Sequence, residues 1–165
     1  MKINEIISKN DKDTKSLQDQ GLYVSVDFDS KTKDRLEKFM EEHRIPNRIS
    51  RDKLHSTVVY SRKWIPFRPK AVDIQVNPRT YEWKMFGDEE EVLVLAFRSP
   101  ELHNRWKQAR NLGATWDYDD YSPHVTLSYD AKGFDFSSLP LPKFPLRIIK
   151  EEHTINDPGS IKDED

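Results

Sequence analysis

An internal repeat constrains this chain more than any other feature, because the same succession of residues returns at an offset of 69 positions. In the first copy, a strand-like segment at 22–28 leads into a helix-like segment from Ser30; in the second, a strand-like segment at 91–98 leads into one from Ser99. Each copy closes on the motif His-x-Thr-x-x-Tyr in a further strand-like segment. A repeat of this length and mixed content is not a solenoid unit. It predicts two similar lobes.

The spacing of apolar residues predicts the elements of these lobes. Residues 22–28 alternate apolar and polar side chains, as a half-buried strand does. Ser30 is predicted to cap a helix that ends near Arg44, and Ser99, followed by a proline, to cap a helix that ends near Gly113. We expect further strands at residues 54–61, 72–76, 80–86, 91–98, 124–130 and 146–155.

One domain accounts for most of the chain, since 165 residues are close to the commonest domain size. We place it at residues 21–156 and expect an α+β fold of two pseudo-symmetric lobes, built on the repeats near 22–61 and 91–130. Residues 1–20 are expected to form a leader with a short helix at its apolar patch. Residues 157–165 are expected to form a disordered tail.

Composition and charge exclude several classes of function. The formal net charge of −2 provides no basic field for long nucleic acid, although a small anionic ligand in a local basic pocket is still allowed. The chain has no cysteine, which excludes disulfides, thiolate metal ligands and a cysteine nucleophile. No apolar run approaches the roughly 20 residues of a membrane-spanning helix, and the first 20 residues lack the apolar core of a signal peptide. We therefore expect a cytoplasmic protein without a membrane partner.

The two copies of the motif contain the candidate catalytic residues. Side chains two apart on a strand share a face, so His55 and Thr57 are predicted to point the same way, opposite to Tyr60. His124 and Thr126 repeat this arrangement. A single His-x-Thr is typical of any polar strand face, but two copies at matching positions indicate a shared function.

Two imidazoles with neighbouring hydroxyls suit the cleavage of a phosphodiester. One imidazole takes a proton from the nucleophile and the other gives one to the leaving oxygen, because histidine titrates near neutral pH. The threonine hydroxyls donate hydrogen bonds to the non-bridging phosphate oxygens. This chemistry needs neither a metal nor another cofactor. The rival interpretation, a zinc site, lacks cysteine and closely spaced histidines and requires scattered carboxylates as ligands.

The sequences Leu54-His55-Ser56-Thr57-Val58 and Pro123-His124-Val125-Thr126-Leu127, about 70 residues apart in a duplicated chain, resemble the 2H phosphoesterase superfamily over residues 22–155. The length, the motif spacing and the opening Gly21-Leu22-Tyr23 resemble its phage anti-CBASS branch, which destroys the cyclic oligonucleotide messengers of bacterial antiphage signalling. The resemblance implies antiparallel sheets that line a central cleft, with the helices outside.

The resemblance also implies a reaction and its residues. A ribose 2′-hydroxyl attacks the adjacent phosphorus of a 3′-5′ linked cyclic di- or trinucleotide that contains adenosine, and the ring opens through a 2′,3′-cyclic phosphate. His55 and His124 are the implied base and acid, in either order, with Thr57 and Thr126 as phosphate contacts. The small cyclic oligonucleotide is the expected partner, and the oligomeric state stays open.

Binding of the bases requires further side chains, for which the sequence offers three candidates. Tyr23 and Trp83 are predicted to stack on bases, although a surface position for Tyr23 and a core position for Trp83 are also compatible with the pattern. Glu152 is predicted to accept a hydrogen bond from the adenine amine, with Glu151 as the adjacent alternative.

Other functions are compatible with the same motifs. Arg62 and Lys63 follow the first motif and either neutralise a phosphate or form an exposed turn. A different 2H activity, on RNA 2′,3′-cyclic phosphates or on 2′-5′ oligoadenylate, uses the same histidines. A non-catalytic protein that sequesters cyclic nucleotides uses the same cleft without turnover.

Overall fold

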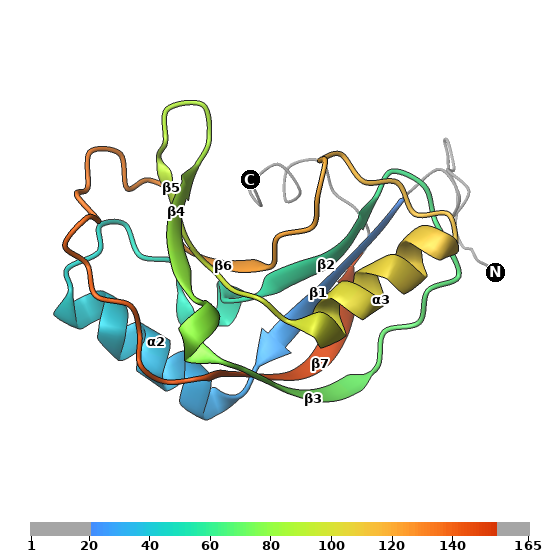
Figure 1. The fold of residues 1–165 in the computed structure, drawn as a ribbon, viewed down its shortest axis with the longest axis horizontal. Helices are drawn as coiled ribbons and strands as arrows, with labels where there is room; N and C mark the ends of the chain where they lie inside the picture. Colours follow the sequence, from blue (N-terminus) through green and yellow to red (C-terminus); the bar gives the residue numbers. More distant parts are fainter. Residues whose placement is uncertain (1–20, 155–165) are drawn as a thin grey trace, which may run out of the picture.

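The computed structural model describes residues 21–154, which form two antiparallel sheets and two helices (Figure 1). The first sheet has the strand order β2-β1-β7-β3 and contains Ser56–Ser61 (β2), Leu22–Phe28 (β1), Leu146–Thr154 (β7) and Ala71–Val76 (β3). The second has the order β4-β5-β6 and contains Glu82–Phe86 (β4), Val92–Ala96 (β5) and His124–Ser128 (β6). The predicted leader and tail lie outside the described residues.

The two helices begin where the sequence predicts, but one cap differs. Helix α2 spans Ser30–Glu42, and the Asp29 carboxylate accepts the Thr32 backbone N–H at 2.8 Å. Asp29 has an extended backbone, whereas Ser30 is already helical, so Asp29 and not Ser30 is the cap. Helix α3 spans Pro100–Asn111 and is capped by Ser99, as predicted. Two single-turn 3₁₀ helices, η1 (Arg51–Lys53) and η2 (Pro78–Thr80), precede β2 and β4.

Each long helix packs against the sheet of the other lobe. Phe39 of α2 stacks on Trp83 of β4, with ring centroids 5.9 Å apart. Helix α3 packs against β2 and is joined to β7 by an ion pair between Arg105 and the buried Glu151, at 2.7 Å. The helices therefore lie outside the sheets and tie the lobes together around one shared core (Figure 1). No helix among residues 21–154 is long and apolar enough to cross a bilayer.

The two lobes repeat the strand register and not just the sequence. Strand β1 pairs with β2 so that Val58 is skipped, which is a β-bulge, and β5 pairs with β6 so that Leu127 is skipped. Val58 and Leu127 are separated by the repeat offset, so the irregularity itself is duplicated. An extra residue interrupts the alternation of side chains. As a result Thr57 and Tyr60 line the same pocket, and the prediction that Tyr60 faces away from Thr57 is wrong.

Candidate active site

Both motif histidines are held by the same kind of hydrogen bond, from the ring to a backbone carbonyl. Nδ1 of His55 lies 2.6 Å from the carbonyl oxygen of Lys53, and Nδ1 of His124 lies 2.9 Å from that of Ser122. A carbonyl oxygen only accepts, so Nδ1 carries the proton in both rings and Nε2 is the reactive nitrogen. Each carbonyl belongs to the residue two positions before its histidine. The structure therefore fixes two imidazoles in one tautomer with equivalent backbone contacts.

This tautomer suits either half of a proton transfer. A neutral ring bonded through Nδ1 presents a lone pair at Nε2 and accepts a proton there; a protonated ring presents an N–H at the same place. Strands β2 and β6, which carry the motif threonines, contact each other across the lobes. The site therefore has one such group on each side of the junction between the lobes.

The threonines lie in less equivalent surroundings than the histidines. The Thr57 hydroxyl forms a hydrogen bond with the Tyr23 hydroxyl at 3.2 Å, and Tyr121 donates to the Thr57 carbonyl at 2.9 Å. Thr126 is buried, and the residue that corresponds to Tyr23 in the second lobe is Val92, which has no hydroxyl. The first motif therefore has a hydrogen-bonded tyrosine that the second lacks.

Tyr23 lies beside the first motif, as its predicted place on the polar strand face requires. Its ring meets the His55 ring edge-on, with centroids 6.4 Å apart. Tyr23 is only 7% exposed, so the alternative of a surface tyrosine is wrong. Tyr23 contacts both His55 and Thr57 of the first motif, and a contact with a base stays a prediction.

Trp83 lies away from the site, and we correct the expectation that it faces a base. Its ring stacks on Phe39 of α2, and its indole N–H donates to the Pro140 carbonyl at 3.3 Å. In β4 it alternates with Lys84, which lies across β5 from Thr126 through Val94. Trp83 is therefore on the helix side of the sheet, as the core alternative anticipated.

The two candidate glutamates of β7 lie in different environments. Glu152 and Thr57 both pair with Ser25, so they share the face of the sheet that carries the motif, and the Glu152 side chain is half exposed. Glu151 is buried and accepts hydrogen bonds from Arg105 and from the Lys70 backbone. Glu151 is thus a structural residue, and only Glu152 is placed to reach a ligand.

A pocket of about 600 Å³ lies between the two lobes, next to the second histidine. Its lining comes mainly from the hairpin between β4 and β5 and from the loop 114–123. Figure 1 shows the backbone of these two segments on either side of β6. Residues that line it are Thr57, Tyr60, Met85, Phe86, Gly87, Asp88, Trp116, Tyr118, Asp120, Tyr121, Ser122 and His124. The Phe86 ring meets His124 edge-on at 5.1 Å.

Sequence reasoning overlooked the aromatic residues of loop 114–123. Trp116, Tyr118 and Tyr121 all line the pocket, and they stand among aspartates just before the second motif. That combination of aromatic and acidic residues is the sequence signal by which the loop could have been identified. Lys84 was also overlooked. By register it occupies in the second sheet the place that Glu152 occupies in the first.

Tyr121 connects this loop to the first motif. Its ring lies flat against Trp106 of α3, with centroids 5.4 Å apart, and its hydroxyl donates to Thr57 O. Burial raises the pKa of Tyr121 well above its ordinary value, with a smaller contribution from the negative charge of Glu151. The hydroxyl therefore keeps its proton and stays a donor.

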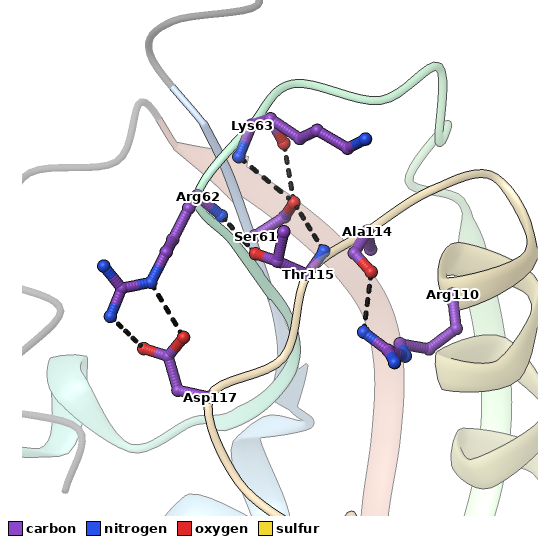
Figure 2. A network of polar contacts seen from close by, with 7 residues as sticks. All are labelled: Ser61, Arg62, Lys63, Arg110, Ala114, Thr115 and Asp117. Carbon is purple, nitrogen blue, oxygen red and sulfur yellow. Dashed lines mark hydrogen bonds and ion pairs between the residues drawn. The ribbon is translucent and has the colours of Figure 1, made fainter.

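A polar network fastens the start of the loop to the end of β2 (Figure 2). The buried Ser61 hydroxyl accepts the Thr115 backbone N–H at 3.1 Å, and the Arg62 backbone N–H donates to the Thr115 hydroxyl at 2.7 Å. The Arg62 guanidinium donates two hydrogen bonds to Asp117, at 2.9 and 3.0 Å. Arg62 thus follows the second of its two predicted alternatives, an exposed residue engaged with the protein.

The described residues contain no group of three or more His, Cys, Asp or Glu side chains placed to hold a metal ion.

Comparison with known proteins identifies the family. The family model described as anti-CBASS protein Acb1 matches residues 20–157. The Acb1 protein of Enterobacteria phage T4 is 41% identical over 119 residues, which cover 71% of this chain and 77% of the relative. That of Salmonella phage S16 is 38% identical over 138 residues, which cover 82% and 90%.

Solved structures agree on the fold. Escherichia coli LigT complexed with NADP+ superposes with a TM-score of 0.60 at 15% identity, covering 84% of this chain and 88% of LigT. A protein described as a phosphoesterase gives 0.59 at 16% identity, covering 85% and 90%. The two-lobed fold predicted from the repeated motif is thereby confirmed. The chain belongs to the anti-CBASS protein Acb1 family and has the fold of the 2H phosphoesterases.

Proposed function

We propose that this protein is a metal-independent phosphodiesterase that opens 3′-5′ linked cyclic di- and trinucleotides containing adenosine, and so counteracts CBASS defence in the cytosol of a bacterial host. The observation that carries the proposal is the matched pair of imidazoles, each anchored through Nδ1. The phage relatives that share the family name support the biological context.

The proposed reaction uses the two imidazoles as base and acid. One imidazole removes the proton of a ribose 2′-hydroxyl through Nε2 as the oxygen attacks the neighbouring phosphorus. The bond from phosphorus to the 5′-oxygen breaks, and the other, protonated imidazole gives that oxygen its proton. The products are an opened chain with a 2′,3′-cyclic phosphate and a free 5′-hydroxyl. Either histidine fits either role, and the roles exchange if water later opens the cyclic phosphate.

Charge on the non-bridging oxygens is the other requirement of the transition state. The hydroxyls of Thr57 and Thr126 are placed two residues from the histidines, and Lys84 extends from the strand face that carries Thr126. Preorganised donors of this kind stabilise charge as it develops. Tyr23 orients the Thr57 hydroxyl through their hydrogen bond.

The test is direct. Incubation with 3′,3′-cyclic GMP-AMP in EDTA should give linear product on a chromatogram, and His55→Ala and His124→Ala should each lower kcat by about 100-fold or more. Recovery of intact ring from the wild-type protein would contradict the proposal.

A panel with 2′-5′ oligoadenylate and an RNA 2′,3′-cyclic phosphate separates the alternative 2H activities. A sequestering protein would bind the ring in stoichiometric amounts without product.

A further inference from the structure

One residue that lines the pocket, Tyr118, is aromatic and largely exposed. Tyr118 is 44% exposed, and the other large apolar residues exposed to this extent among residues 21–154 are Leu112 and Leu141. Neither of these two lines the pocket beside His124, whereas Tyr118 does. Ligand pockets are lined mainly by apolar and aromatic side chains, so an exposed aromatic ring in such a pocket is a candidate ligand contact.

The ring of Tyr118 is supported from within the loop. Trp116 meets it edge-on, with centroids 5.6 Å apart, and Trp116 in turn contacts Trp106 and Tyr121. The Trp116 indole N–H donates to the Asp120 carbonyl at 3.0 Å. Tyr118 is therefore held at the end of an aromatic cluster that is continuous with α3.

The charge of the pocket indicates what it accepts. Among residues 21–154, its lining includes Asp88 and Asp120 but no lysine or arginine. Thr57 and His124, the groups proposed to contact the scissile phosphate, line the same pocket. Near Asp88 and Asp120, by contrast, a phosphate would be repelled, whereas an uncharged base that carries an amino group would be tolerated or bound. The volume of about 600 Å³ is within the range of small-molecule sites.

The loop that carries Tyr118 is positioned by the network at the end of β2 (Figure 2). Asp117, the residue before Tyr118, receives both hydrogen bonds of Arg62, and Thr115 is bonded to Ser61 and to the Arg62 backbone. Arg62 is 73% exposed at its side chain, so this pair contributes little to global stability. Its effect is local, because it fixes the position of the loop 114–123, which forms one wall of the pocket.

We propose that this pocket binds one nucleobase of the substrate, that Tyr118 stacks on the base, and that Arg62 and Asp117 are positioning residues for Tyr118. The inference rests on the proposed function and specifies its substrate contact. Stacking of a base on an aromatic side chain, removed by alanine substitution, corresponds to a change in affinity of roughly 5- to 150-fold.

The first experiment measures binding of 3′,3′-cyclic GMP-AMP by calorimetry in the His55→Ala background, where the ring is not turned over. Adding Tyr118→Ala should raise Kd by roughly 5- to 150-fold, and Tyr118→Phe should leave it within about twofold because the ring is retained. Leu141→Ala, a matched control with a side chain of similar exposure elsewhere, should not change Kd. Equal Kd values for Tyr118→Ala and its parent would overturn the inference.

The second experiment tests the positioning residues in the otherwise wild-type enzyme. Arg62→Ala and Asp117→Ala should each raise KM by about two- to fivefold, with kcat and the urea midpoint unchanged, and the double variant should be no worse than either single variant. Additive effects on KM, or an unchanged KM, would remove Arg62 and Asp117 from the proposal.

Failure of the proposed function has a different signature. If wild-type protein leaves the ring intact, the phosphodiesterase proposal falls, and the Tyr118 series is titrated with 3′-AMP instead. A weaker Kd for Tyr118→Ala then supports the base pocket, and an unchanged Kd overturns it.

Discussion

At the scale of single residues, the two motifs share their imidazole chemistry but differ in what surrounds the hydroxyls. The Nδ1 contacts of His55 and His124 are equivalent, whereas only the Thr57 hydroxyl is bonded to a tyrosine. Tyr23 also lies edge-on to His55, so it touches both members of the first motif. This difference is the feature that can distinguish the acid from the base.

Tyr23→Phe tests that difference. Loss of the hydroxyl removes the hydrogen bond that orients Thr57 and should lower kcat by about 2- to 10-fold, which corresponds to one net hydrogen bond. Steady-state kinetics on 3′,3′-cyclic GMP-AMP provides the measurement. Tyr81→Phe is the control, because the Tyr81 hydroxyl donates to the Phe144 carbonyl and does not line the pocket. An equal loss in both variants would argue against a role for Tyr23 in orienting Thr57.

At the scale of elements, periodicity predicted the strands and helices, but not where their irregularities fall. Strand β2 begins at Ser56 and not at Leu54, because η1 ends at Lys53 and Leu54 is its C-cap. The bulge at Val58 was not predictable, because it exists only in the pairing of β2 with β1. Trp83 was ambiguous for a similar reason, since its charged neighbours do not show which side of β4 meets α2.

The candidate catalytic residues stand out in the sequence because a repeat compares the chain with itself. The histidines and threonines were found from their matching offsets, which need no knowledge of packing. The aromatic loop 114–123 has no counterpart that repeats its pattern, and its place depends on contacts with α3 and with the end of β2. Its function therefore required the structure.

The junction of α3 with β7 provides a prediction about the two adjacent glutamates. Glu151→Ala leaves Arg105, which is 13% exposed at its side chain, without its carboxylate, and should lower the free energy of unfolding by about 3–5 kcal/mol. Glu152→Ala should leave that free energy within about 0.5 kcal/mol while it weakens substrate binding. Urea unfolding and calorimetry measure the two effects. A stable Glu151→Ala protein would contradict the structural role of this carboxylate.

At the scale of the whole molecule, the two lobes form a single unit. Each long helix packs against the sheet of the other lobe, and the lobes share one core. Buried tyrosines at two places in this unit link its stability to alkaline pH. Burial raises the pKa of Tyr81 and of Tyr121 above the ordinary value near 10. Below pH 10 both residues carry their proton in the folded and unfolded states. Above it the unfolded chain loses protons that the folded protein retains, so stability falls as pH rises.

We therefore expect the urea midpoint to decrease between about pH 10 and pH 11, with each tyrosine contributing up to about 1.4 kcal/mol per pH unit. Tyr121→Phe and Tyr81→Phe should each reduce this slope, because phenylalanine does not ionise. Midpoints at neutral pH provide the reference for each variant. A slope that is the same in both variants and in the wild type would show that other groups control the alkaline transition.

The carbonyl contacts of the two histidines make their tautomers insensitive to side-chain substitutions at the anchoring residues. Because main-chain atoms set the tautomer of both rings, substitution of the Lys53 or Ser122 side chain leaves the proton chemistry in place. The pocket walls, by contrast, consist of side chains on a hairpin and a loop. Point mutations in these walls can therefore alter what the pocket accepts, while the tautomers of the two histidines stay the same.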